Sequence, residues 1–259
     1  MDLKLTGKTA FVTGSTAEIG FGIDRRLLLQ EGTNNSAALR VDGGTVSTIL
    51  WFHPGFMPTA DTIIFDLGGV LIDWNPEYLY RKIFSNENDL RYFLENICTS
   101  AWNQEQDAGY PLAQATAELA TKYPQYDAEI KAYYSRWQEM LGGYDEKCVA
   151  ILENLHQKKN YQLLGLTNWS SETFHTAKKM YPFLDLFKGI VVSGDEKIKK
   201  PDPRLYQILI DRYGIQPGKS IFIDDTKINV EIAEDLGFQT IHFLSANQLQ
   251  EELQKLGLI

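Results

Sequence analysis

The feature that most constrains the fold of this chain is a repeated alternation of short apolar segments with longer helical patterns. The apolar segments lie at residues 62–66, 161–167, 189–193, 220–224 and 239–243. Between them, the spacing of apolar residues predicts helices over 145–157, 171–180, 203–213 and 228–236. Strands that alternate with helices of this length form crossover connections. The sequence therefore predicts an α/β fold with a parallel sheet that is covered by helices on both faces.

Residues 74–143 interrupt this alternation. The stretch is rich in helix formers and aromatic residues, and it contains no convincing strand pattern. We therefore expect a helical insertion here, which divides the α/β core into residues 57–73 and 144–259. The loop at 73–76 is the expected hinge between the two parts.

Residues 1–56 differ in composition from the rest of the chain. They hold 8 of the 20 glycines, and their acidic and basic side chains balance, so the net charge of -9 resides in the remainder. A cluster of breaker residues at 53–59 marks the expected boundary.

Composition excludes several classes of protein. An acidic chain of 259 residues is not expected to bind nucleic acid, because its surface repels phosphate backbones. The two cysteines are too few for a disulfide framework or a cysteine-rich zinc site. No apolar run is long enough to span a membrane, and the first residues lack the layout of a signal peptide. We therefore expect a cytoplasmic protein with no membrane or nucleic-acid partner, and the sequence does not indicate an oligomeric state.

Polar side chains follow four of the predicted strands. Because ligands bind outside the carboxyl ends of the strands in an open parallel sheet, we expect these side chains to meet at one edge. A lysine in a short loop, followed by proline, joins them. The set consists of Asp66, Thr167, Ser193, Asp224, Asp225 and Lys200. Adjacent carboxylates repel one another unless a cation lies among them, and hard oxygen ligands suit Mg²⁺.

Each of these residues also has a purely structural interpretation. An aspartate at the end of an apolar strand is often a helix cap, Asp224 and Asp225 are placed to cap the helix at 228–236, and a Lys-Pro pair is often only a loop. The ordered set of polar strand ends is harder to explain as coincidence. A magnesium ion, an ammonium and a hydroxyl together form a receptacle for a phosphoryl group.

Over about residues 60–245 the chain resembles the haloacid dehalogenase-like (HAD) hydrolases. The resemblance rests on four motifs in the family's order: Phe-Asp-Leu-Gly-Gly-Val-Leu at 65–71, Leu-Thr-Asn at 166–168, Lys-Lys-Pro-Asp-Pro at 199–203 and Phe-Ile-Asp-Asp at 222–225. The helical insertion follows the first motif, where one subclass of the family carries an α-helical cap. The resemblance implies a Rossmann-like core, with residues 74–143 as the cap. A subgroup that opens with Asp-Leu-Gly, and that includes sugar 1-phosphate phosphatases, is the most similar.

The resemblance also implies catalytic roles. Asp66 corresponds to a nucleophile that forms an aspartyl-phosphate, which water then hydrolyses. Thr167 and the backbone N–H of Asn168 correspond to groups that hold the phosphoryl oxygens. Lys200, rather than Lys199, corresponds to the lysine that offsets the charge of the aspartate and the phosphate.

A magnesium site is implied by the same motifs. Asp225, Asp66 and the backbone carbonyl of Gly68 correspond to its ligands, and Asp224 lies close enough to bind or orient the ion. Asn229 corresponds to a position where many relatives carry another acid, and it could orient a metal-bound water. The expected substrate is a small phosphorylated metabolite.

Gly68 departs from the pattern of many phosphatases in the family, which carry at this position an aspartate that acts as general acid and base. Such help is commonly worth about 10²–10⁴-fold in rate. One explanation is a substrate whose leaving group needs little protonation, such as a sugar 1-phosphate or an aryl phosphate. A second is another proton donor, for which Asp73 is the nearest candidate in sequence. A third is that the chain is a dehalogenase or a catalytically inactive binding protein.

A dehalogenase of this family uses the same aspartate to displace halide from carbon without a metal. That function predicts neutral side chains in the fourth motif and a positive halide pocket. Asp224 and Asp225 oppose it, because paired acids repel a carboxylate substrate.

The N-terminal residues resemble fragments of a short-chain dehydrogenase. Residues 8–23 are similar to the glycine-rich opening of that family, and residues 39–46 to its closing segment. Glu18 replaces the middle glycine, and the body between the two segments is missing. Tyr78 and Lys82 fit the spacing of the catalytic pair, but they lie within the expected cap. We expect no bound nicotinamide cofactor and no dehydrogenase activity.

Overall fold

The computed structural model describes residues 60–259 without a break, together with four short strands before them. The chain divides into two units, Met1–Thr59 and Ala60–Ile259. In the first unit, β2 (Ser36–Val41) pairs antiparallel with β1 (Leu29–Glu31), β3 (Gly44–Thr45) and β4 (Ile49–Leu50). The glycine-rich segment 8–23 lies outside the described residues.

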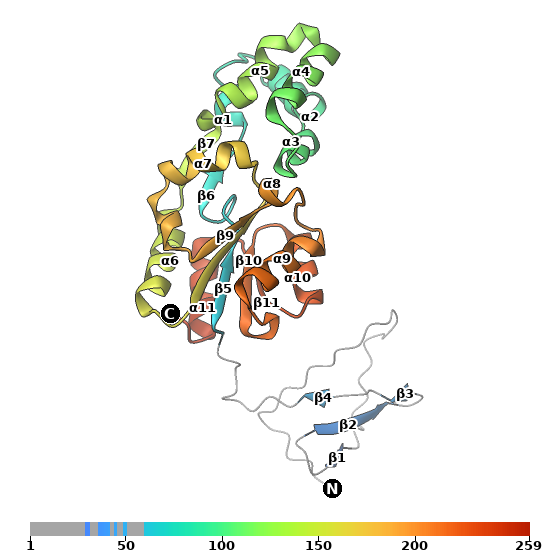
Figure 1. Ribbon diagram of the computed structural model, residues 1–259, viewed down its shortest axis with the longest axis vertical. Helices are drawn as coiled ribbons and strands as arrows, with labels where there is room; N and C mark the ends of the chain where they lie inside the picture. The colour runs from blue at the N-terminus through green and yellow to red at the C-terminus, as the bar shows by residue number, and fades with distance from the viewer. Residues whose placement is uncertain (1–28, 32–35, 42–43, 46–48, 51–59) are drawn as a thin grey trace. The chain divides into compact units, whose positions relative to one another are not determined.

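The second unit is built on a parallel sheet of five strands in the order β11-β10-β5-β8-β9 (Figure 1). The strands are β5 (Thr62–Phe65), β8 (Gln162–Thr167), β9 (Gly189–Val192), β10 (Ser220–Asp224) and β11 (Gln239–His242). Central β5 pairs in register with β10 (Thr62 opposite Ser220) and with β8 (Thr62 opposite Gln162). This confirms the predicted α/β class with a Rossmann-like parallel sheet, and each predicted strand is present.

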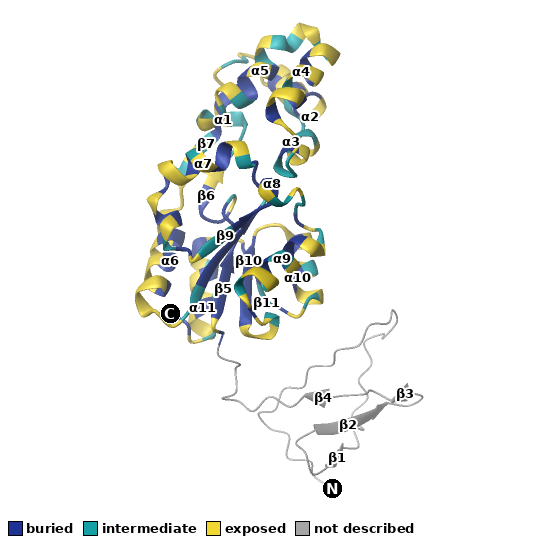
Figure 2. Cartoon of the chain, in the orientation of Figure 1, coloured by how far each residue is buried: buried dark blue, intermediate teal, exposed yellow. Residues whose placement is uncertain are grey.

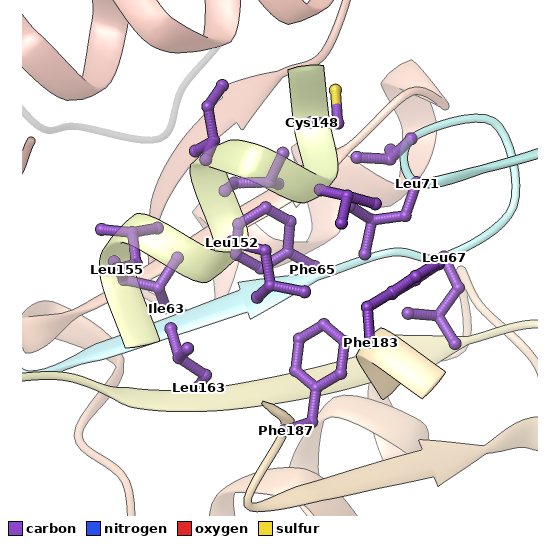
Figure 3. Packing of buried hydrophobic residues seen from close by; sticks show 14 of the residues in the cluster. Ile63, Phe65, Leu67, Leu71, Cys148, Leu152, Leu155, Leu163, Phe183 and Phe187 are labelled. Carbon is purple, nitrogen blue, oxygen red and sulfur yellow. The ribbon is translucent and has the colours of Figure 1, made fainter. Parts of the chain in front are cut away.

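Helices cover both faces of this sheet, so β5 and β10 at its centre are buried throughout (Figure 2). The helices are α6 (Glu146–Lys158), α7 (Ser171–Met180), α8 (Ser193–Glu196), α9 (Pro203–Tyr213), α10 (Lys227–Asp235) and α11 (Ala246–Lys255). Successive residues of β5 belong to different cores. Ile63 and Phe65 pack with α6 and α11, whereas Ile64 packs with α9. Figure 3 shows Leu152 and Leu155 of α6 against the first of these faces.

A helical cap with its own core lies beyond the carboxyl ends of the strands (Figure 1). Its helices are α1 (Glu77–Tyr80), α2 (Glu87–Asn96), α3 (Ser100–Asp107), α4 (Leu112–Lys122) and α5 (Asp127–Ser135). Aromatic rings fill the cap core, with the Tyr80 and Phe93 centroids 4.7 Å apart and Trp102 edge-on to Tyr133. Short 3-10 helices complete the described fold at Pro124–Tyr126, Trp137–Met140, Pro182–Leu186 and Pro217–Lys219.

The connection between core and cap is a two-stranded ribbon, so the expectation that residues 74–143 contain no strand was wrong, whereas the hinge at 73–76 stays a prediction. Strand β6 (Ile72–Trp74) pairs antiparallel with β7 (Leu141–Tyr144), and Asp73 lies within it opposite Gly143. The Tyr78 hydroxyl donates to Asp73 Oδ2 over 2.6 Å. A side chain at Gly142 would overlap this pair, so this glycine permits the close approach, whereas Gly143 has φ +110°, which favours glycine.

Within residues 60–259, no helix is long and apolar enough to cross a membrane.

The last residue of α3 carries a partly buried carboxylate whose titration can be measured. Burial raises the pKa of Asp107 to about 7, although the Ser170 backbone and Lys199 oppose the shift. The unfolded chain releases this proton near the ordinary value of 3.8, so the folded state holds an extra proton between about pH 4 and 7. The contribution of Asp107 to the free energy of unfolding therefore falls as the pH rises through this window.

Asp107→Asn should remove that pH dependence, because the amide does not ionise and can keep the hydrogen bond from Asn103. We expect the stability of the variant relative to wild type to rise from pH 4 to 7, by at most about 1.4 kcal/mol per pH unit. Urea unfolding at several pH values measures this difference. A difference that stays constant over the window would contradict the assignment.

Candidate active site

The site lies at the carboxyl edge of the central strands β10, β5 and β8. Asp66 directly follows β5, Thr167 is the last residue of β8, and Asp224 is the last residue of β10. Because these strands are parallel neighbours, their ends place the three side chains at one edge. Lys200 reaches the same place from the loop between α8 and α9.

Lys200 is the centre of the charge network. Its ammonium donates to Asp66 Oδ2 over 2.8 Å, to Asp224 Oδ2 over 2.7 Å and to the Leu166 carbonyl over 2.8 Å. These three partners use all three protons of the ammonium, whose side chain is fully buried. Burial lowers the pKa of Lys200, but the two carboxylates outweigh it and hold the pKa above its ordinary value. The ammonium therefore stays positively charged, and its three hydrogen bonds fix its position.

The acidic pair at the end of β10 divides into two environments. Asp224 is fully buried and accepts hydrogen bonds from the Thr226 N–H and the Asn229 amide, in addition to Lys200. Asp225 is exposed, and its carboxylate accepts only a 3.3 Å hydrogen bond from the Thr226 hydroxyl among the described residues. Asp224 is thus occupied in holding Lys200, whereas the carboxylate of Asp225 is available to a ligand.

Asp66 carries a strongly perturbed carboxyl group. Burial raises its pKa to about 7, Lys200 opposes the shift, and the charges of Asp224 and Asp225 add to it. Its Oδ1 accepts from the backbone N–H of Leu67 over 2.7 Å, while Oδ2 faces Lys200. Partial desolvation of the Asp225 carboxylate by the surrounding protein raises its pKa, with the charge of Asp224 as the second cause. The protein alone therefore leaves Asp66 partly protonated near neutral pH, and a nearby cation would favour its ionised, nucleophilic form.

The residues after β8 support the lysine from the other side. Asn168 accepts from the Lys200 N–H over 2.8 Å and donates to the Lys200 carbonyl over 3.0 Å. Thr167 is 1% exposed, and its hydroxyl has no hydrogen-bond partner among residues 60–259. No fully buried side-chain polar atom of the described residues lacks a partner, so this hydroxyl keeps some exposure and is accessible to a ligand oxygen.

The donor set fits a divalent cation. Carboxylate oxygens of Asp66, Asp224 and Asp225 lie within 4.8 Å of one another, and the Lys200 ammonium pairs with the first two of these acids. This leaves two negative charges uncompensated if all three are ionised, which a hard dication such as Mg²⁺ would neutralise. The main chain at Gly69 adjoins one of these acids, because a Cβ at Gly69 would overlap the Asp225 carboxylate. Asp66 and Asp225 are therefore the side chains suited to hold the ion, with Asp224 orienting Lys200 beside it. The Gly68 carbonyl stays a ligand that the family resemblance implies.

The two glycines at 68 and 69 offer a matched test of this arrangement. Gly69 has φ +76°, and any side chain there would displace Asp225. Gly68 has no atom within 4 Å of a Cβ position. We expect Gly69→Ala to weaken Mg²⁺ binding about 10–100-fold, the usual cost of losing ligand orientation. We expect Gly68→Ala to bind Mg²⁺ nearly as the wild type does.

Thermal unfolding at increasing Mg²⁺ concentrations measures both apparent affinities, since an ion that binds only the folded state raises the melting temperature. Equal affinities for the two variants would contradict the proximity of Gly69 to a metal-binding Asp225.

Three side chains from the sequence analysis lie elsewhere or act differently. Lys199 points to the cap, with its ammonium 3.3 Å from Glu105 Oε1. Asp73 pairs with Tyr78 in the ribbon, and the charges that shift the pKa of Asp66 come from other residues. Asn229 donates to both oxygens of Asp224 over 3.0 and 3.2 Å, so it orients a carboxylate, and its expected contact with a metal-bound water stays a prediction. Sequence reasoning missed the role of Gly69, for which the only signal was the Gly-Gly pair after the strand.

Comparisons with known proteins show which proteins the chain is similar to. A family model described as haloacid dehalogenase-like hydrolase matches residues 63–243. A sesquiterpene phosphatase of Aspergillus oryzae is 26% identical over 198 residues, which cover 76% of this chain and 97% of that protein. An (S)-2-haloacid dehalogenase of Burkholderia cepacia is 31% identical over 194 residues, which cover 75% and 78%. A HAD family enzyme of Bacteroides thetaiotaomicron, solved with magnesium and inorganic phosphate, has a TM-score of 0.54 at 23% identity, covering 70% and 93%.

Proposed function

The chain belongs to the haloacid dehalogenase-like hydrolase family, and from that premise we propose that it is a Mg²⁺-dependent phosphatase of a small phosphorylated metabolite. The observation that carries the proposal is the cluster of Asp66, Asp224 and Asp225 around one buried lysine. The single ammonium cannot balance three ionised acids, and a bound metal ion would supply the remaining positive charge. When bound, Mg²⁺ would offset the charge of the phosphoryl group and of the acids around it.

Asp66 is the nucleophile in this proposal. A carboxylate oxygen of Asp66 bonds to phosphorus while the ester P–O bond breaks, which gives an aspartyl-phosphate and the free alcohol once the leaving oxygen has gained a proton. Water then attacks the phosphorus and releases inorganic phosphate, so that the carboxylate is regenerated. Lys200 stays within reach of Asp66 and offsets negative charge through both steps. Thr167 and the backbone N–H of Asn168 are the proposed donors to the phosphoryl oxygens.

Gly68 directs the choice of substrate, because it cannot supply the proton that a poor leaving group needs. Asp73 is a weak substitute, since its carboxylate is engaged with Tyr78 in the ribbon. We therefore propose that the substrates are esters with good leaving groups, such as sugar 1-phosphates or aryl phosphates. The open space beside Gly68 has room for the missing carboxyl group.

Phosphate release from a panel of esters, with and without Mg²⁺, tests the function. We expect activity only with Mg²⁺, and faster hydrolysis of sugar 1-phosphates and p-nitrophenyl phosphate than of sugar 6-phosphates. Gly68→Asp should raise the rate on 6-phosphates by up to about 10²-fold and reduce the preference, because it adds a general acid. Equal rates on the two ester classes in the wild type would disprove the leaving-group argument. Binding without turnover across the panel would favour an inactive binding protein.

A dehalogenase is the second candidate, and the similarity to the Burkholderia cepacia enzyme favours it. Such an enzyme would attract a carboxylate substrate to a site that already holds three acids and one ammonium. That charge balance opposes the binding of an anion without a metal. Halide release from 2-chloropropionate in the presence of EDTA would establish the dehalogenase instead.

The remaining proposals concern surroundings and partners. We propose a cytoplasmic enzyme that acts on small molecules and binds neither membranes nor nucleic acid, in keeping with a net charge of -9. We also propose that residues 1–56 bind no dinucleotide, because a segment this short cannot enclose one. Calorimetry with NAD would disprove this second point if it detected binding.

A further inference from the structure

Ser193 is a polar strand end that the proposed chemistry does not use. It is 0% exposed, and its hydroxyl contacts backbone groups of two separate elements. The hydroxyl accepts from the Trp169 N–H over 2.9 Å, and it donates to the carbonyl of Asp107 at the end of cap helix α3. It does not cap its own helix, α8, which lacks a side-chain cap. The hydroxyl therefore joins the cap to the loop after β8.

Close packing of backbones reinforces this connection. A Cβ at Gly109, in the turn after α3, would come within 2.9 Å of the Gly194 carbonyl. A Cβ at Gly194 would in turn overlap the Ser171 N–H and the Trp169 carbonyl. At these two glycines, backbone packs directly against backbone: the turn of the cap against α8, and α8 against the loop at 169–171. Movement of one of these three segments therefore displaces the next.

The two elements joined by Ser193 have distinct places in the proposed reaction. Trp169 directly follows Thr167 and Asn168, the proposed phosphoryl-binding residues. Asp107 ends the cap helix that also contacts the core through Lys199 and Glu105. The cap also reaches the core through the β6–β7 ribbon and through the Leu112 N–H, which donates to Glu172 Oε1 over 2.9 Å.

We propose that Ser193 is a positioning residue that couples docking of the cap to the conformation of the phosphoryl-binding loop. The hydroxyl has one proton to donate. When the cap is docked, the Ser193 hydroxyl donates this proton to the Asp107 carbonyl. When the cap moves away, the nearest other acceptor is the Trp169 carbonyl, which lies 3.4 Å from Ser193 Oγ. Movement of the cap therefore changes the hydrogen bonding of the loop that receives the phosphoryl group. The assignment of that loop rests on the proposed function, whereas the contacts do not.

Hydrogen exchange of the full chain, followed by mass spectrometry, tests the coupling. Ser193→Ala should increase exchange about two- to tenfold in both segments 104–112 and 166–172, the range expected for loss of one neutral hydrogen bond on each side. Lys199→Met is the matched control, because it removes a contact with the cap but leaves the Ser193 hydroxyl in place. It should increase exchange in segment 104–112 alone.

Gly109→Ala provides a second route if Ser193→Ala does not fold. It alters only the cap, yet its side chain would push against the Gly194 carbonyl, so we expect faster exchange in segment 166–172 as well. Faster exchange in only one segment of Ser193→Ala would overturn the proposal, as would an equal response of segment 166–172 to Lys199→Met. If Ser193→Ala is not folded, unchanged exchange of segment 166–172 in Gly109→Ala would overturn it.

Inorganic phosphate with Mg²⁺ separates this inference from the proposed function. Adding phosphate and Mg²⁺ should slow hydrogen exchange in both segments of the wild type. In Ser193→Ala the same addition should slow exchange only in segment 166–172. Protection of segment 104–112 by phosphate in Ser193→Ala would overturn the coupling. If phosphate protects nothing in the wild type, the proposed phosphoryl site is wrong, and the comparison of variants without phosphate still decides the role of Ser193.

Discussion

Asp66→Asn is expected to lower the rate of phosphate release by about 10⁴-fold or more, because the amide keeps the shape of the side chain but cannot form the aspartyl-phosphate. The variant should remain folded. Removing one of three clustered acids relieves repulsion, and Lys200 keeps its bonds to Asp224 and the Leu166 carbonyl. Steady-state phosphate release at saturating Mg²⁺ measures the first effect, and thermal unfolding measures the second.

Asp73→Asn is the matched control for this substitution. Both residues are aspartates near the first motif, but Asp73 lies in the ribbon and hydrogen-bonds to Tyr78. We expect its replacement to leave most of the activity in place. Substantial activity in Asp66→Asn would disprove the nucleophile, and a loss in Asp73→Asn as large as that in Asp66→Asn would show that the ribbon carboxylate takes part in the reaction.

The adjacent lysines 199 and 200 are expected to differ sharply when each is replaced by methionine. Lys200→Met leaves the acids of the site without their buried ammonium, so we expect a loss of about 3–5 kcal/mol in the free energy of unfolding and no detectable turnover. Lys199→Met removes an ion pair whose partner, Glu105, is 68% exposed, so we expect a loss below about 1 kcal/mol. Urea unfolding without Mg²⁺ at neutral pH measures both losses.

The pH dependence of the Lys200→Met loss gives a further check. The unpaired acids can take up protons as the pH falls, so the loss should be smaller at pH 5 than at pH 8. A loss below about 1 kcal/mol at pH 8 would contradict the view that this lysine compensates buried carboxylates.

The helices and strands of the core could be predicted because local signals agree with the tertiary structure. Helix α9 has both end signals in the sequence: the Asp202 side chain accepts from the Arg204 N–H at its start, and Gly214 has φ +62° at its end. The strands are continuous apolar runs because both faces of the sheet are buried. The convergence of Asp66, Thr167 and Asp224 then follows from the parallel order of their strands.

The rest depends on contacts between segments that are distant in the sequence. The β6–β7 ribbon is short, and its glycines make β7 resemble a loop. Helix α11 follows the last strand and was not predicted, although Ser245 caps its first turn. The different tasks of Asp224 and Asp225 are set by Lys200, Asn229 and the turn at Gly69, none of which a strand-end pattern can place.

The most direct test of the account is the chemical state of Asp66 during turnover. Wild-type enzyme mixed with an active phosphate ester and Mg²⁺ is quenched in acid, digested and analysed by peptide mass spectrometry. We predict that the peptide containing Asp66 carries one phosphoryl group on that residue, and that the modification is absent from Asp66→Asn and from samples treated with EDTA. Turnover of the ester with Asp66 unmodified, or with the phosphoryl group on another residue, would contradict the account.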